Sequence, residues 1–315
     1  MKKVLCALLI CSVIYNIDST TLVYNMKIRR AFAAGSLLHI NKNRRFMWLL
    51  TALPIYYHRT RNLSIQQLPN TIHENTRSGG SIFNTRLLAP YHWWAELTIG
   101  LERQTSQYGA PSNAHASRTG FDDIVISIGK NFFFAQNNGQ VVVYGLAGFP
   151  THRGVSQADQ FDTQVGTRFF GLGGGGEISY SFIKQAKQAL IGVLETRFVH
   201  FFNRHWSPIL PCDARIQPGN ITDLVLLLQY RRKKNVIEVG YNPTFFTNQA
   251  VLLPAQTIKT DTFVRNSVYA NYLHLLEQLP LIKMPGGLGA GINLGRANRF
   301  DTKIFACWLN LTMLV

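Results

Sequence analysis

The chain has 315 residues, of which 46% are hydrophobic and only 15% charged, and its formal net charge is +16. This composition is apolar for a soluble protein, yet no apolar run approaches the ~20 residues that a membrane-spanning helix needs. A helical membrane protein is therefore excluded, and the apolar residues must be distributed through the chain in another pattern.

The N-terminal residues have the pattern of an export signal. Lys2 and Lys3 precede an apolar run over 4–15, and polar residues follow it. This order predicts a secretory signal peptide over 1–24. A clear small-x-small triplet near residue 19 is missing, so the sequence does not fix the cleavage site. Residues 25–45 form a basic N-terminal segment, and 46–315 remain for the folded part.

Strict alternation of apolar and polar residues marks the folded part. From Trp93 to Arg103 the odd positions are apolar, whereas the even positions include Glu96 and Glu102. The same pattern runs from Ile124, from Asp223 and through the last residues of the chain. Successive side chains of a strand point to opposite faces, so each stretch predicts a strand with one apolar and one polar face.

Twelve such stretches are found in chain order. They lie near 46–58, 82–89, 93–103, 124–131, 141–150, 165–182, 189–202, 223–231, 236–246, 264–277, 287–295 and 309–315. Stretches of about ten residues are long enough for a tilted strand to cross a bilayer.

The connectors alternate between long and short. The long ones, rich in polar residues, Gly and Pro, cover 59–81, 103–120, 151–164, 203–220 and 247–263; the short ones cover 90–92, 135–140, 183–188, 232–235 and 279–286. The last link, 296–301, departs from this order because it is short. The alternation predicts an all-β fold, an up-and-down antiparallel transmembrane β-barrel of about 12 strands (range 10–14). The alternative is a soluble β-sandwich, which explains the export signal poorly.

Aromatic residues occur in doublets and triplets at the expected strand ends. They are Trp93-Trp94, Phe132 to Phe134, Phe169-Phe170, Phe201-Phe202 and Phe245-Phe246. Residues of this kind form the interfacial girdles of membrane barrels.

Residues from about 45 to 315 therefore resemble Gram-negative outer-membrane β-barrel proteins of the porin-like, twelve-stranded kind. The resemblance is architectural. Proteins of this class include narrow channels for nucleosides or acidic sugars. It implies location in the outer membrane of a Gram-negative bacterium, with short turns and both termini in the periplasm. One departure is the terminal Val315, because such barrels usually end in Phe or a related aromatic residue.

Eight charged residues are expected to face the lumen. They are Glu96, Glu102, Glu177, Glu195, Arg197, Arg231, Glu238 and Arg265. Acids outnumber bases among them, so the basic excess belongs to the N-terminal segment, the loops and the turns. There it can contact the anionic head groups of outer-membrane lipids, or it can select anionic solutes at the loop mouth. Nucleic acid is not an expected partner, because an exported barrel does not meet it.

The sequence offers little support for catalysis, a cofactor or a metal. Gly171 to Gly176 match GxGxxG by letter, but the residues after them alternate as a strand does. Two H-x-S pairs, His115 with Ser117 and His205 with Ser207, fall in predicted loops. We expect a non-enzymatic porin or narrow channel for small hydrophilic solutes. The alternatives are a closed structural or adhesive barrel with partner-binding loops and, less favoured, an outer-membrane lipid hydrolase that uses His205 and Ser207.

Overall fold

The computed structural model describes residues 46–63, 72–109, 115–151, 169–185, 188–202, 204–206, 214–248, 250–252, 257–259, 262–279, 285–297 and 302–314. The expected signal peptide and basic N-terminal segment lie outside this part of the chain. Within it, no helix is long and apolar enough to cross a membrane.

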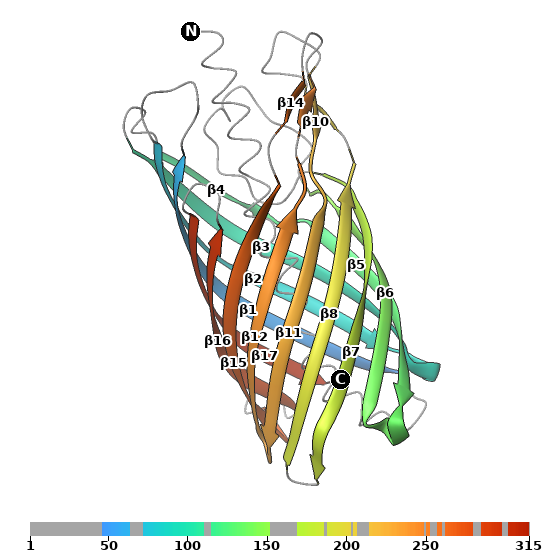
Figure 1. The fold of residues 1–315 in the computed structure, drawn as a ribbon. Helices are drawn as coiled ribbons and strands as arrows, with labels where there is room; N and C mark the ends of the chain where they lie inside the picture. Colours follow the sequence, from blue (N-terminus) through green and yellow to red (C-terminus); the bar gives the residue numbers. More distant parts are fainter. Residues whose placement is uncertain are drawn as a thin grey trace.

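Twelve long strands form one closed antiparallel barrel, which confirms the predicted fold class and strand number (Figure 1). Each strand pairs with the next along the chain, and β1 pairs with β17 to close the cylinder. The strands are β1 (Met47–Leu63), β2 (Ile72–Leu88), β3 (Trp93–Tyr108), β5 (Ile124–Phe134), β6 (Gly139–Phe149), β7 (Gly171–Gln185), β8 (Gln188–Phe201), β11 (Ile221–Arg232), β12 (Asn235–Phe246), β15 (Phe263–Leu276), β16 (Gly286–Ala297) and β17 (Thr302–Leu314).

The remaining elements lie at the two ends of the barrel. Two short 3-10 turns, η1 (Pro90–His92) and η2 (Ala135–Asn137), close the β2–β3 and β5–β6 links. β4 (His115–Phe121) pairs with the C-terminal part of β3, from Leu101 to Gln107. It directly precedes β5 in the chain. A small separate sheet lies beyond the same end of the barrel as β4 (Figure 1). It consists of β9 (Arg204–Trp206), β10 (Ala214–Gln217), β13 (Ala250–Leu252) and β14 (Thr257–Lys259).

Several strands extend into segments that the sequence assigns to loops. β1 and β2 pair continuously from Met47↔Leu88 to Leu63↔Ile72, so their connector is much shorter than 59–81. Likewise β3 reaches Tyr108, and β4 begins at His115 within the predicted loop 103–120. The outward positions in this part of β2 are not apolar, as those of a lipid-facing strand would be; they hold Asn75, Arg77 and Gly79. Apolar alternation therefore stops before the hydrogen-bonded ladder does.

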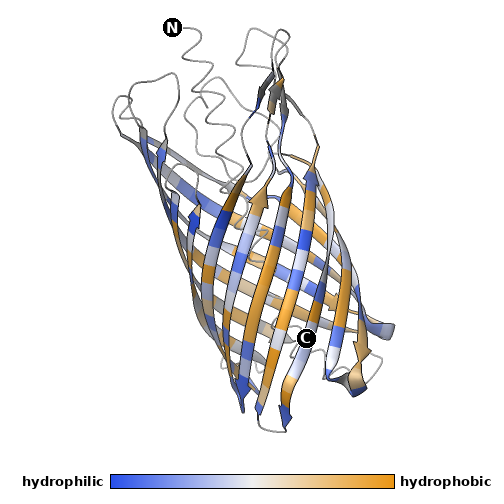
Figure 2. Ribbon diagram, viewed as in Figure 1, coloured by the Kyte–Doolittle hydropathy of each residue, from blue (hydrophilic) through white to orange (hydrophobic). Residues whose placement is uncertain are grey.

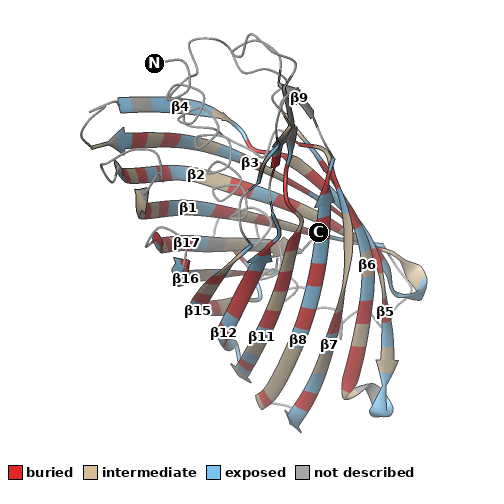
Figure 3. Cartoon of the chain, turned by 45° about the horizontal axis from the view of Figure 1, so that its top comes forward, coloured by how far each residue is buried: buried red, intermediate tan, exposed pale blue. Residues whose placement is uncertain are grey.

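The alternation itself is confirmed in the central part of the strands. On β3, Leu97 is 41% exposed whereas Glu96 is 4% exposed, and the burial pattern repeats on its neighbours (Figure 3). Figure 2 shows hydrophobic residues alternating with hydrophilic ones along the strands. The outer face is thus apolar, as a lipid-facing surface requires, and polar side chains line much of the inner face.

Only one ring of each of these aromatic doublets lies on the outer face, although both were expected in the interfacial girdle. Phe202 and Phe245 are exposed, but their neighbours Phe201 and Phe246 are buried inside the barrel. Trp93 and Trp94 divide in the same way. Consecutive residues of a strand cannot share a face, so each doublet contributes one ring to the girdle and one to the interior.

The two ends of the barrel differ in their connections. The links β2–β3, β5–β6, β7–β8, β11–β12 and β15–β16 share one end, which we call the short-link end; the other is the long-connector end (Figure 1). Met47 pairs with Leu88 and Leu49 with Leu314. Both limits of the described chain therefore lie at the short-link end.

Candidate channel lumen

The inner wall holds the eight charged residues expected to face the lumen. Glu96, Glu177, Glu195, Arg197, Glu238 and Arg265 are buried, and Glu102 and Arg231 are half-buried. Their immediate neighbours on the outer face include exposed Leu97, Ile178 and Leu194. All eight occupy inward positions of their strands, but their partners come largely from residues that the sequence reasoning had not selected.

Near the long-connector end, Arg59 of β1 contacts Glu74 of β2. Their Nη2 and Oε1 atoms are 3.2 Å apart, and both side chains are 1% exposed. Thr76 donates to the same carboxylate oxygen over 2.8 Å, and its hydroxyl lies 3.0 Å from that of Ser106 on β3. Sequence reasoning missed this group because 59–81 has no apolar alternation. Polar residues at alternate positions, Glu74, Thr76 and Ser78, were the available signal.

Near the short-link end, Arg86 of β2 binds Glu96 of β3. Its Nε and Nη2 donate to Oε2 over 2.8 and 2.6 Å. The guanidinium also lies 4.5 Å from the ring centre of Trp94, which is close enough for a cation–π contact. Glu96 is one of the predicted residues, whereas Arg86 falls in a stretch where alternation is weak.

A third network crosses four neighbouring strands. Arg197 of β8 forms an ion pair with Asp223 of β11, which also accepts a 2.7 Å hydrogen bond from Thr244 of β12. Arg265 of β15 donates to the Thr244 hydroxyl over 3.3 Å. Buried opposite charges need close geometry and further hydrogen bonds to compensate their desolvation, and this network supplies both.

Glu177 and Glu195 form a different arrangement. They are directly paired across β7 and β8, and both point inward. Tyr144 of β6 donates to Glu195 over 2.5 Å. Within the described part of the chain, Glu177 makes no hydrogen bond or ion pair, although it is only 8% exposed. Like charges directly opposite each other on a sheet repel.

A second acidic group lies where β4 gives way to β5. The Asp122 backbone N–H donates to the Gly100 carbonyl over 2.8 Å, which fixes Asp122 against β3. Glu102, two residues along β3, accepts a 2.5 Å hydrogen bond from Ser78. A small recess is lined by Glu102, Asp122 and Ser78 together with Ile55 and Ile82.

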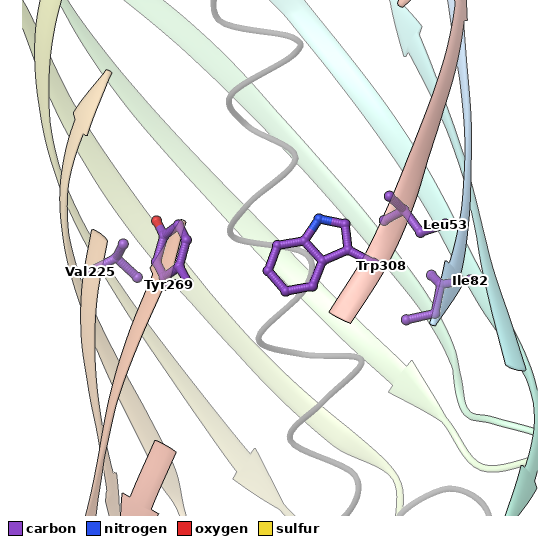
Figure 4. Close-up of a cluster of buried hydrophobic side chains, with 5 residues drawn as sticks. All are labelled: Leu53, Ile82, Val225, Tyr269 and Trp308. Atoms are coloured by element: carbon purple, nitrogen blue, oxygen red, sulfur yellow. The ribbon is translucent and has the colours of Figure 1, made fainter. Parts of the chain in front are cut away.

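Apolar side chains interrupt the polar lining at mid-height. Leu53, Ile82, Val225, Tyr269 and Trp308 are all buried and form one cluster, which we call the apolar belt (Figure 4). Figure 4 shows Val225 and Tyr269 on one side and Trp308, Leu53 and Ile82 on the other. The sequence did not predict this belt, because single apolar residues at inward positions look like breaks in the alternation.

Two glycines allow the aromatic rings of the belt to lie against the wall. A Cβ atom at Gly291 would lie 2.2 Å from the indole of Trp308, and one at Gly240 would lie 2.3 Å from the ring of Tyr269. Any larger residue would collide with these rings. At Gly291 the indole of Trp308, from the adjacent strand, therefore occupies the space that the missing side chain leaves.

The balance of buried charge is opposite in sign to that of the whole chain. Among the described residues, eight buried acidic side chains stand against four buried arginines, an excess of four acidic groups. The chain as a whole carries +16. The interior is therefore acidic, and the basic residues lie elsewhere.

The motifs considered for catalysis are dispersed. His115 and Ser117 lie on β4, where the Ser117 hydroxyl is 3.3 Å from that of Thr105. His205 belongs to β9, and Ser207 lies outside the described residues. Gly171 to Gly176 belong to β7. In the ranges that the structure describes, no group of three or more His, Cys, Asp or Glu residues could hold a metal ion.

Comparison with known proteins relates the chain to outer-membrane barrels through structure alone. No protein-family model and no curated protein matches it. It is similar to a solved outer-membrane channel from Pseudomonas putida F1, with a TM-score of 0.57 and 12% identity over 85% of this chain and 95% of the other. The β-domain of the Bordetella autotransporter BrkA follows with a TM-score of 0.47 and 9% identity, over 86% of this chain and 99% of that domain. The NanC porin gives 0.39 and 10%, over 84% and 98%.

The likeness to the Pseudomonas channel shows the fold. The chain is a twelve-stranded β-barrel with the architecture of Gram-negative outer-membrane proteins. The resemblance expected from the alternation of strands and connectors is thereby confirmed.

Proposed function

We propose that this protein is a non-enzymatic channel in the outer membrane of a Gram-negative bacterium, and that small hydrophilic solutes pass through its lumen. The observation that carries the proposal is the inner wall, where eight strands contribute buried charged side chains and several of these are joined by ion pairs and hydrogen bonds. The interior of a channel barrel is polar, and charged side chains in its lumen set which solutes pass. A barrel of twelve strands has an interior between that of a packed core and that of an open porin.

The basic excess fits a second role in this setting. Arg232, Lys233 and Lys234 are exposed at the short-link end, where the barrel meets the head groups of one leaflet. We infer that they bind anionic lipid head groups and phosphates. In this proposal the lipids interact with the rims, whereas the solute interacts with the acidic interior.

A closed structural or adhesive barrel is the second candidate. The small sheet of β9, β10, β13 and β14 supports it, because ordered structure beyond the barrel gives the long connectors a surface for a partner. The two functions differ in whether ions cross the barrel.

Single-channel conductance in planar bilayers distinguishes them. The full chain is refolded, and its folding is verified by the heat-modifiable gel mobility of membrane barrels. Discrete conductance steps are expected from a channel. Silence from protein shown to be folded would contradict the channel and favour the structural barrel.

A further inference from the structure

The apolar belt continues around much of the lumen wall. Ile82 pairs with Leu53, and Ile55 pairs with Trp308, which pairs in turn with Gly291. On the next strands Tyr269 pairs with Gly240, and Gly240 pairs with Leu227. At this level the seven adjacent strands β2, β1, β17, β16, β15, β12 and β11 thus contribute apolar side chains or glycine.

Carboxylates occupy both ends of this apolar arc. At one end Val225 of β11 pairs directly with Glu195 of β8, and Glu195 pairs with Glu177 of β7. At the other end the recess joins Ile55 and Ile82 to Glu102 and Asp122. The wall at mid-height therefore has an apolar arc that carries two aromatic rings, and carboxylates border this arc at both ends.

The nearest arginines each form an ion pair with another carboxylate. Arg197 is bound to Asp223, and Arg86 is bound to Glu96. Glu177 is more than nine-tenths buried and has no hydrogen-bond or ion-pair partner within the described residues. Its carboxylate is therefore available to a bound group, and it lies directly opposite the carboxylate of Glu195.

We propose that this level of the lumen is a binding site for a small organic cation, an amine or guanidinium group attached to an apolar body. The proposal rests on the channel function and specifies its class of solute. The charged group is placed against Glu177 and Glu195, where charge-assisted hydrogen bonds are strongest. The apolar body lies over Trp308 and Tyr269, whose ring faces also attract cations.

The first test compares three ligands of similar shape. The full chain, refolded in detergent micelles, is titrated by calorimetry with 2-phenylethylammonium, 2-phenylethanol and 3-phenylpropanoate. The cation is expected to bind at least about tenfold more tightly than the alcohol, a difference of about 1.4 kcal/mol. The anion is expected to bind more weakly than both. Equal affinities for the cation and the alcohol, or tighter binding of the anion, would overturn the proposal.

The second test uses one variant of the facing carboxylates and one variant of the apolar arc. Glu177→Gln and Trp308→Leu are each expected to weaken cation binding about tenfold, and Glu177→Gln should leave binding of the alcohol unchanged. Glu277→Gln is the matched control, because Glu277 is an exposed carboxylate in the β15–β16 link. Each variant must retain the heat-modifiable mobility of the parent. An equal loss of alcohol binding in Glu177→Gln would assign that residue a structural role and overturn the proposal.

Conductance separates failure of this site from failure of the channel. Conductance without preference for the cation would refute the site alone. Selective cation binding by a protein that is silent in bilayers would refute the channel and retain the site. In a salt gradient, a cation-selective reversal potential that Glu177→Gln reduces would support both.

Discussion

Two pairs of charged residues on neighbouring strands of the barrel wall differ in the sign of their interaction. Arg197 and Asp223 are opposite charges, paired in register across β8 and β11 and held by a hydrogen bond from Thr244. Glu177 and Glu195 are like charges, paired in register across β7 and β8. The first pair stabilises the barrel wall, whereas repulsion between the two carboxylates of the second pair destabilises it. Charge that does not stabilise the fold is the better candidate for binding a solute.

The strongest test of this comparison is Asp223→Ala. The variant leaves the buried Arg197 without its carboxylate and removes the acceptor of Thr244, so the free energy of unfolding should fall by about 3 kcal/mol. Urea unfolding in lipid vesicles, followed by tryptophan fluorescence, measures the change. Asp223→Asn, which retains a hydrogen-bond acceptor, should lose less. A loss below about 1 kcal/mol would show that water solvates Arg197 as well as Asp223 does.

Gly291→Ala sharpens the contrast by changing the wall without changing charge. The new Cβ would collide with the indole of Trp308, and the expected destabilisation is about 2 kcal/mol. Combining the substitution with Trp308→Leu should recover part of this loss, and a thermodynamic cycle of the four proteins measures the coupling. Additive effects would mean that ring and glycine do not interact.

Glu177→Gln should have the opposite sign from Asp223→Ala. Removing one of two facing carboxylates relieves their repulsion, so we expect stability to rise by up to about 1 kcal/mol. The same vesicle unfolding experiment applies. Destabilisation by this variant would show that Glu177 holds the wall together, and the proposed contrast would fail.

The smallest effect is expected at Glu277. Lys234 Nζ lies 2.9 Å from its carboxylate and lowers the pKa of Glu277 by a hydrogen bond and by its charge. A lowered pKa contributes stability above the ordinary pKa, and that stability is lost as the pH falls through the lowered value. Because both side chains are exposed, solvent screening should make Glu277→Gln indistinguishable from the parent in unfolding curves between pH 3 and 8. A clear difference would reveal a more rigid short-link end than the exposure indicates.

Alternation in the sequence was sufficient to predict the barrel and the inward positions of its strands. It placed Glu96, Glu177 and Glu195 on the polar face because their neighbours Leu97, Ile178 and Leu194 are apolar. The prediction failed where the outward residues are also polar, as around Glu74 on β2. It missed Arg86 because the inward residues Ile82 and Leu88 beside it are apolar. Periodicity needs two contrasting faces, and it is lost wherever a strand leaves the bilayer.

The sequence could not predict which inward side chains contact one another, for a different reason. Glu195 and Arg197 share one face of β8, yet Arg197 forms its ion pair with Asp223, and Glu195 accepts a hydrogen bond from Tyr144. Register between strands decides such contacts, and a shift of one residue would reverse every inward position. The position of Trp308 over Gly291 likewise depends on the pairing of β16 with β17.

Closure of the cylinder through β1 and β17 has a consequence for the order of folding. Every other junction of the barrel joins strands that are neighbours in the chain, so those hairpins form by local encounters. The seam joins Leu49 to Leu314 and must wait until nearly the whole polypeptide is available. Until that moment two strand edges offer unpaired amides and carbonyls to any other chain. The biogenesis of this protein therefore depends on a late, long-range step, and shielding of the two edges before that step protects it from aggregation.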